Sequence, residues 1–444
     1  MKSVLKRIVT FGLAAAIATS VTGCATSNQS SSSDVASEKK SGSKTVITLG
    51  MHVANVDEQE PVTGKIIKAF EQANPNITVQ IQGNDKDAHV NKMKLDAQSG
   101  ELPDIFWMDS SVAPQLNSSG VLLDLSDFLK AYPAVNTALS ENMKAASRSS
   151  DGKQYGLPYQ SLVTGFWYNK AVFKRVGIDA PKNGTTYDEL IKMVKALHAK
   201  GIIPIAQGAK DAYSVWGFLT GLERYGYFSK IDSILNGKAK FDNPDFLKYF
   251  SKINTLGKAG AFPSNCATST YFQAKADFTS GKAAMFDSGV WDAGVLDKSI
   301  GKNVGFWWGP TFQDSSDNQK VSMNVSSAPF CVSKAVGDNQ SKKDAVYKFL
   351  AFYYSKQAAK ISYEGSIIPA TNYKVDANLE SKPAFNAVVT ALQESGWSSP
   401  KAQPDLVLTE AVQAQLYDSI YGTMLGTYSP KEALEKIDSV QQQQ

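Results

Sequence analysis

Aromatic and short polar side chains occur together at several points of the sequence. Trp107 stands two residues before Asp109, Asp287 stands four residues before Trp291, and Asn55 follows an apolar run. An aromatic ring packs well against the C–H face of a ring-shaped ligand, and carboxylates and amides accept or donate hydrogen bonds at its hydroxyls. This combination is typical of a site for a polyhydroxylated ring such as a sugar.

The elements that must position these residues alternate between strand and helix. The pattern predicts strands at 45–51, 77–82 and 104–108, and helices at 61–73 and in the stretch that Gly100 closes. Strands separated by helices indicate an α/β fold with parallel strands. In such sheets ligands bind beyond the carboxyl ends of the strands, which is where the aromatic and polar residues occur.

The same alternation continues in the second half of the chain. Further strands are predicted at 165–168, 202–206 and 283–286, and Thr186 to Glu189 form a capping box that opens a helix. Long helical stretches are expected near 344–355 and 405–421. The chain therefore contains at least two α/β halves.

Length and composition limit the possible classes of protein. The 444 residues are too many for one ordinary core, and 43% hydrophobic with 20% charged residues excludes a wholly disordered chain. A formal charge of +4 is too small to indicate a nucleic-acid partner. Three scattered histidines disfavour a multi-histidine metal site, so we expect neither a metal nor a cofactor.

The N-terminus has the pattern of an export signal. Positive residues precede an apolar run from Ile8 to Ala18, and Val21-Thr22-Gly23-Cys24 then resembles the bacterial lipobox. We expect a signal peptide over 1–23, and over 24–44 a lipidated Cys24 followed by a Ser-rich tether; the alternative is a plain secretory signal. Two acyl chains on Cys24 would anchor the protein stably in a lipid bilayer. Loss of the signal lowers the formal charge from +4 to +1.

Five motifs then carry a family resemblance. The stretch 102–109, LPDIFWMD, resembles the "PDVFWM" strand end of family 1 extracellular solute-binding proteins, the binding components of carbohydrate ABC importers. Four more motifs resemble that family in the same order: DGKQYGLPY at 151–159, WYNK at 167–170, SGKAAMF at 280–286 with Trp291, and GSIIPA at 365–370. Together they cover nearly all of the chain beyond the tether.

The resemblance implies a two-lobed, periplasmic-binding-protein-like α/β fold with a cleft between the lobes and three crossovers. We expect crossovers near 157–159, 308–312 and 366–370. Lobe 1 would then comprise 45–157 plus 312–366, and lobe 2 would comprise 158–308 plus 370–444.

The same resemblance implies a binding protein rather than an enzyme. The expected ligand is an oligosaccharide, and the expected partners are the membrane permease subunits of an ABC importer. The protein would act as a monomer on the extracytoplasmic face of the cell membrane. Maltodextrin-binding members carry a Trp in the penultimate helix, but the stretch near Gln413 has none, so maltodextrin specificity is in doubt.

Two alternatives stay open from the residues themselves. One is a binding protein for a non-sugar solute such as a peptide, a polyamine or a metal ion. The other is a secreted glycoside hydrolase, in which Asp287 and Asp292 would supply the two carboxylates.

The candidate sugar-binding residues follow strands, lie near a crossover or stand in a loop. They are Asn55, Trp107, Asp109, Gln160, Trp167, Trp216, Asp287, Trp291, Trp308 and Trp397. Each also has a structural interpretation: Asp109 could cap a helix, and Trp167 could belong to the core. Trp307 and Trp308 face opposite sides of one strand, so at most one of them should reach a ligand.

The cysteines beyond Cys24 are expected to be structural. Cys266 and Cys331 fall in different expected lobes, where a disulfide between them would block a hinge motion. We therefore expect two free, buried thiols.

Overall fold

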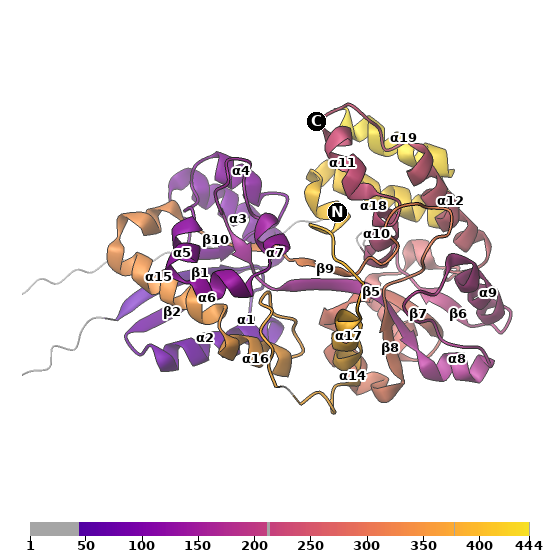
Figure 1. The fold of residues 1–444 in the computed structure, drawn as a ribbon, viewed down its shortest axis with the longest axis horizontal. Helices are drawn as coiled ribbons and strands as arrows, with labels where there is room; N and C mark the ends of the chain where they lie inside the picture. The colour runs from indigo at the N-terminus through magenta and orange to yellow at the C-terminus, as the bar shows by residue number, and fades with distance from the viewer. Residues whose placement is uncertain (1–43, 211–213, 377, 444) are drawn as a thin grey trace, which may run out of the picture. The chain divides into compact units, whose positions relative to one another are not determined.

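The computed structural model describes residues 44–210, 214–376 and 378–443. The expected signal peptide, Cys24 and the tether up to residue 43 lie outside the described residues. Two mixed β-sheets surrounded by helices make up the described part (Figure 1). Among the helices of the described part, none has both the length and the apolar character needed to cross a lipid bilayer.

The first sheet is built mainly from the N-terminal segment of the chain. Its strand order is β2-β1-β3-β10-β4, with β1 (Thr45–Met51), β2 (Ile77–Gly83), β3 (Ile105–Trp107), β4 (Leu157–Pro158) and β10 (Pro329–Val332). β1 runs parallel to β2 and β3, whereas β10 is antiparallel to β3 and β4. The predicted strands at 45–51, 77–82 and 104–108 are confirmed, with ends that shift by one residue at most.

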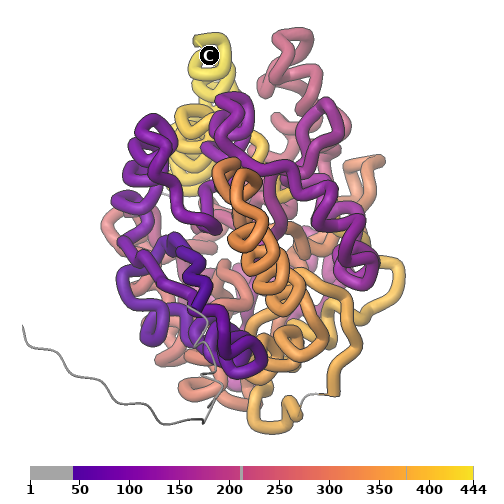
Figure 2. The backbone as a smooth tube through the Cα atoms, turned by 90° about the vertical axis from the view of Figure 1, so that its left-hand side faces the viewer, coloured from indigo at the N-terminus to yellow at the C-terminus, as the bar shows by residue number. Residues whose placement is uncertain are grey.

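Helices alternate with these strands as the periodicity predicts. Figure 2 shows the N-terminal segment beside the distant segment that contains α15, which packs on β1 and α2. The helices of this part are α1 (Val56–Gln59), α2 (Pro61–Ala73), α3 (Lys86–Ser99), α4 (Ala113–Ser118), α5 (Ser126–Ala131), α6 (Pro133–Ala138), α7 (Glu141–Ala145), η4 (Lys334–Asp338), α15 (Gln340–Tyr353) and α16 (Lys356–Glu364).

The second sheet is centred on the long strand β5. Its order is β6-β7-β5-β8, with β5 (Ser161–Asn169), β6 (Ile203–Ala206), β7 (Ala283–Gly289) and β8 (Val304–Trp307), and β9 (Met323–Ser326) pairs with the first half of β5. β6 and β7 are parallel, and β5 is antiparallel to β7, β8 and β9.

The remaining helices lie between or after the strands of the second sheet in the sequence. Thr186 and Glu189 form the predicted capping box at the start of α9. These helices are α8 (Lys170–Val176), α9 (Tyr187–His198), α10 (Trp216–Glu223), α11 (Tyr227–Leu235), α12 (Pro244–Lys258), η1 (Cys266–Thr268), α13 (Tyr271–Thr279), η2 (Val290–Asp292), α14 (Ala293–Ser299), η3 (Gly301–Asn303), α17 (Pro383–Gln393), η5 (Pro404–Val407), α18 (Glu410–Leu425) and α19 (Pro430–Gln441).

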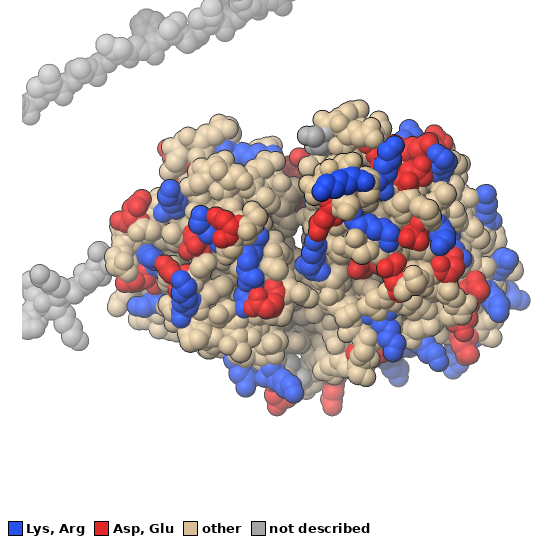
Figure 3. Space-filling view, turned by 45° about the horizontal axis from the view of Figure 1, so that its top comes forward, with Lys and Arg blue, Asp and Glu red and all other residues tan. Residues whose placement is uncertain are grey.

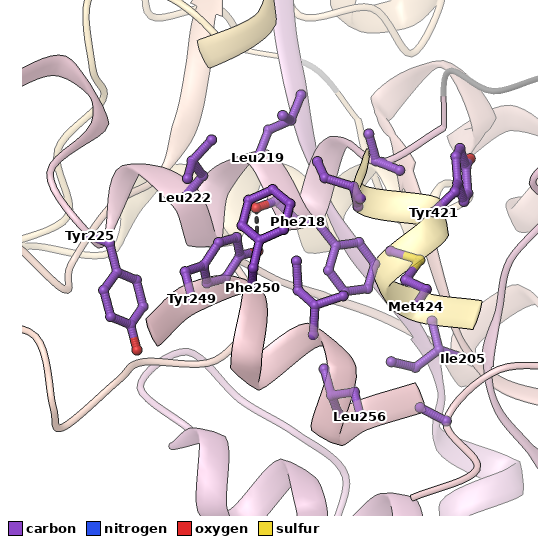
Figure 4. Packing of buried hydrophobic residues seen from close by; sticks show 14 of the residues in the cluster. Ile205, Phe218, Leu219, Leu222, Tyr225, Tyr249, Phe250, Leu256, Tyr421 and Met424 are labelled. Carbon is purple, nitrogen blue, oxygen red and sulfur yellow. Dashed lines mark hydrogen bonds between the residues drawn. The ribbon is translucent and has the colours of Figure 1, made fainter. Parts of the chain in front are cut away.

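A large apolar core fixes α10 against α12 and α18. Phe218 and Leu222 of α10 pack with Phe250 of α12 and Met424 of α18, and the Tyr249 hydroxyl donates to the Phe218 carbonyl (Figure 4). Because these side chains are buried, α10 is held firmly where it begins beside the sheet.

The chain passes between the sheets later than the expected crossover at 308–312. β9, at 323–326, still pairs with β5, and only β10 joins the first sheet. Buried Arg224 gives a physical reason, because its guanidinium donates to the carbonyls of Trp308, Pro310 and Val321 at 2.9 Å each. These bonds keep the segment after β8 with the second sheet.

Candidate ligand-binding cleft

A cleft of about 680 Å³ is lined by residues from elements of both sheets. Trp107 ends β3 and Asp109 follows it, while Lys86 begins α3. The opposite wall contains Trp216 at the start of α10, with η5 and α18 beside it. The lining residues are Asp85, Lys86, Asp87, Trp107, Asp109, Ser110, Leu162, Trp216, Ala328, Gln403, Asp405, Leu406, Gln413 and Tyr417.

A second hollow of about 480 Å³ adjoins the cleft and shares Ser110 and Leu406 with it. Small polar residues such as Ser111 and Ser327 contribute to its lining. The two hollows together offer more space than one sugar ring needs, which suits an extended ligand.

Trp107 forms an aromatic wall that is supported from behind. The His52 ring stacks on it with centroids 4.1 Å apart and planes 20° apart, and His89 Nε2 lies 2.7 Å from the Trp107 carbonyl oxygen. Burial lowers the pKa of His52 to about 4, with a smaller contribution from His89. A neutral imidazole therefore backs the indole at neutral pH, and the indole keeps one orientation.

Asp109 is ionised on the same wall. Burial acts to raise the pKa of its carboxyl, but Lys86 and Ser111 outweigh burial and lower the pKa below its usual range. Lys86 Nζ lies 3.2 Å from Oδ2, and the backbone and hydroxyl of Ser111 donate to Oδ1 at 3.0 and 2.8 Å. The carboxylate bonds to Ser111 and Lys86 and does not cap α4, and its oxygens can accept further hydrogen bonds on the cleft side.

Asp405 and Tyr417 face the cleft from the opposite wall. Asp405 is only 2% exposed, its Oδ2 accepts from the Tyr417 hydroxyl, and its Oδ1 meets no hydrogen-bond donor within the described residues. Burial raises the pKa of Asp405, the hydrogen bond from Tyr417 offsets part of this rise, and the charge of Asp109 adds to it. Neither residue is among those predicted from the sequence. The available signal was the spacing of Gln413 and Tyr417, which places them on one face of α18.

Asp287 bonds to the start of α10 and is not among the described residues that line the cleft. Its carboxylate is fully buried and accepts from the Gly217 amide at 2.7 Å, in the first turn of α10. Burial raises the pKa of Asp287 well above its usual range. The predicted direct contact with a ligand is therefore replaced by a positioning role, because Asp287 fixes the helix start that presents Trp216.

Trp291 stands directly beside Trp216. The two indoles meet edge to face with centroids 4.8 Å apart, and the Trp291 Nε1–H donates to the Tyr271 hydroxyl at 2.9 Å. Trp291 is 36% exposed. An aromatic surface thus continues from Trp216 in the cleft to Trp291 outside the cleft lining.

Two predicted tryptophans belong to the core. Trp167 and Trp308 are completely buried, and the Trp167 Nε1–H donates to the Gly289 carbonyl at 3.2 Å. Trp307 and Trp308 do face opposite sides of β8, but α17 covers the Trp308 side and the main core covers the other. Packing on both faces of the sheet therefore keeps all three indoles from a ligand.

Three further candidates have structural contacts outside the residues that line the cleft. The Asn55 side chain caps α1, and Trp397 lies over the Arg224 guanidinium at 5.9 Å. Gln160 and Ser327 exchange hydrogen bonds of 3.0 Å where the two segments pass between the sheets. Their roles in binding stay predictions.

The carboxylate pair considered for hydrolysis lies away from the open cleft. Asp292 is buried, binds Lys275 Nζ at 2.8 Å and accepts from the hydroxyls of Tyr271 and Ser288. The Asp287 carboxylate accepts a hydrogen bond from the backbone of α10. Within the described residues, His, Cys, Asp and Glu form no group of three or more suited to a metal ion. Cys266 and Cys331 are free and buried, as expected.

The chain belongs to the bacterial extracellular solute-binding protein family, whose profile matches residues 65–387. This confirms the resemblance drawn from the five motifs. The mixed α/β fold is likewise confirmed by a solved "Chitin oligosaccharide binding protein", which is 25% identical with a TM-score of 0.76 over 90% of this chain and 99% of that chain.

Two curated relatives carry different ligand names. The "Multiple sugar-binding protein" of Streptococcus mutans serotype c is 28% identical over 53% of this chain and 55% of that protein. The "sn-glycerol-3-phosphate-binding periplasmic protein UgpB" of Brucella melitensis biotype 1 is 27% identical over 62% of this chain and 60% of that protein. The chain thus spans a little over half the length of the curated relatives it matches.

Proposed function

We propose that this protein binds an uncharged oligosaccharide in the cleft between its sheets and delivers it to an ABC permease. The observation that carries the proposal is the composition of the two walls. Trp107 with Asp109 faces Trp216 with Asp405 and Tyr417, which supplies ring surfaces and hydroxyl-binding groups on both sides. The relatives named for sugars support the same ligand class.

The charge of the cleft favours an uncharged sugar over a phosphorylated solute. Of the described residues that line the cleft, four are aspartates and one is a lysine. A phosphate there would be repelled by the carboxylates of Asp109 and Asp405, and Lys86 is already paired with Asp109. On the face drawn in Figure 3, basic and acidic side chains are interspersed, which gives no strong field that would attract an anion.

Binding would work by closure of the two lobes. A sugar that contacts both walls stabilises the closed arrangement over the open one, because only the closed arrangement provides both sets of contacts. The hinge would consist of the segments that connect the two sheets, near 158–161 and 326–329, together with the stretch at 366–370. The closed, loaded protein would then dock on the permease and release the sugar without covalent chemistry.

The family and the N-terminal motif support a proposed location. We place the protein on the extracytoplasmic face of the cell membrane as a monomer, tethered through acylated Cys24. Mass spectrometry of the membrane fraction tests the anchor. A mature N-terminus other than diacylated Cys24 would contradict it.

A melting-temperature screen tests the ligand class. Mono- and oligosaccharides, glycerol 3-phosphate, peptides and polyamines are added in turn to the purified protein. Saturation at 100 times the Kd should stabilise the folded protein by about 2.7 kcal/mol. Stabilisation by an oligosaccharide that is recovered intact supports the proposal. Stabilisation only by glycerol 3-phosphate, a peptide or a polyamine, or cleavage of the saccharide, would overturn it.

Small-angle scattering tests closure. The radius of gyration should fall when the sugar from the screen saturates the protein. An unchanged radius at saturation would contradict the hinge mechanism.

A further inference from the structure

An exposed phenylalanine lies at the end of a chain of ring contacts that begins in the cleft. Phe272, in the first turn of α13, is 64% exposed, and its neighbour Tyr271 is buried. Burying apolar area is what stabilises a fold, so a large aromatic side chain left in water contributes little to this one. Single exposed apolar side chains are common, so the case for binding rests on the ring contacts that join Phe272 to the cleft.

Ring contacts connect Phe272 to the cleft without a break. Trp216 lines the cleft and meets both Trp291 at 4.8 Å and Tyr271 at 5.7 Å between centroids. Tyr271 in turn meets Phe272 at 5.4 Å. The four rings, which we term the aromatic row, therefore lead from the inside of the cleft to the protein surface.

The aromatic row is held rigidly by buried polar groups. The Tyr271 hydroxyl accepts from the Trp291 indole and donates to the buried carboxylate of Asp292. Lys275 pairs with the same carboxylate, and its Nζ lies 4.8 Å from the Phe272 ring centroid. Since these partners fix the rings before any ligand binds, a ligand that contacts them loses little affinity to ordering of the protein.

We propose that the aromatic row is an outer sugar platform, so that the ligand is an oligosaccharide longer than the cleft, with its distal rings on Trp291 and Phe272. The proposal rests on the proposed function and adds the length of the ligand to it. Continuity with Trp216 argues for the saccharide as occupant. A protein surface that recognised the permease would have no need of ring contacts with the cleft interior.

The experiment compares saccharides of increasing length in matched variants. Di-, tetra- and hexasaccharides of N-acetylglucosamine, xylose and glucose are titrated by calorimetry into wild type, Phe272→Ala, Trp291→Ala and Leu95→Ala. Leu95 is the matched control, because it is also a 64% exposed apolar side chain and belongs to α3. Melting temperatures without ligand verify that each variant is folded.

The expected result is a length-dependent loss. Phe272→Ala should weaken binding of the longest bound saccharide by about three- to tenfold and leave the shortest bound one unchanged. Trp291→Ala should do the same from a shorter length onward, and Leu95→Ala should behave as wild type at all lengths.

Two results would overturn the inference, and they are distinguishable. If wild type binds saccharides but Phe272→Ala matches Leu95→Ala at every length, the platform is refuted while the sugar-binding function stands. A transport defect of Phe272→Ala with unchanged sugar affinity would then assign the exposed ring to permease docking. If wild type binds no saccharide of any series, the proposed function fails and the platform with it.

Discussion

The Asp405→Asn variant tests whether cleft charge selects the ligand. The substitution keeps the shape of the side chain and an oxygen that can accept from the Tyr417 hydroxyl, but it removes the negative charge that Asp405 carries once the pH exceeds its raised pKa. A ligand phosphate about 4 Å from the wild-type carboxylate would be repelled by about 4 kcal/mol at an effective dielectric constant of about 20. That energy corresponds to about a thousandfold in Kd.

The assay is a pair of titrations with a bound sugar and its phosphorylated counterpart. In wild type the phosphorylated sugar should bind far more weakly. In Asp405→Asn its relative affinity should rise by up to about a thousandfold. Asp127→Asn is the control, because Asp127 is exposed and pairs with Lys130 on the surface. An unchanged ratio of the two affinities in Asp405→Asn would refute the charge argument.

The same variant has a signature in stability. Burial raises the pKa of Asp405 in the folded protein. Its stabilising contribution is therefore fully present below the pKa of the unfolded chain, about 3.9, and is lost as pH rises through the higher folded pKa. Asparagine does not titrate, so the free energy of unfolding of Asp405→Asn relative to wild type should increase as pH rises from about 4. Parallel profiles in urea denaturation would contradict the burial effect.

Three further predictions concern stability. Trp167→Ala should lower the free energy of unfolding by about 3–5 kcal/mol because it opens a cavity in a closed core, whereas a small loss would place Trp167 at the surface. Arg224→Met should lower it by about 4 kcal/mol or more, since four backbone carbonyls lose a buried donor; melting of the purified variant tests this. The pKa of His52 is about 4 in the folded protein and about 6.5 when unfolded, so wild type should lose up to about 3 kcal/mol as pH falls through that window. His52→Phe keeps the stack on Trp107 and should lose less stability over the same pH range. Equal losses in the two proteins would show that folding does not lower the pKa of His52.

Local patterns in the sequence predicted the elements well. The strands around 45–51, 77–82 and 104–108 and the helix capped by Thr186 form where periodicity and capping place them. These features depend on neighbours within a few residues, which a sequence displays directly. The point at which the chain crosses from the second sheet to the first was harder to predict. Long-range bonds from Arg224 and the pairing of β9 with β5 decide it.

The choice among the tryptophans could not be made from the sequence. Trp107, Trp167 and Trp308 lie in or directly after strands and Trp216 begins α10, but the apolar cluster that includes α17 closes over Trp167 and Trp308. Local sequence does not show which face of a strand a distant helix will cover. Asp287 was misread for the same reason, because its partner is the start of a helix 70 residues away.

The sequence by itself determined the α/β class, the family and the aromatic and acidic character of the site, since these reside in short motifs and composition. Only the tertiary structure decided which side chains line the cleft. Asp405 and Tyr417 stand about 300 positions after Trp107 in the chain and share the cleft lining with it. The physical reason is that a cleft is made by surfaces that packing leaves uncovered, and packing depends on all elements at once.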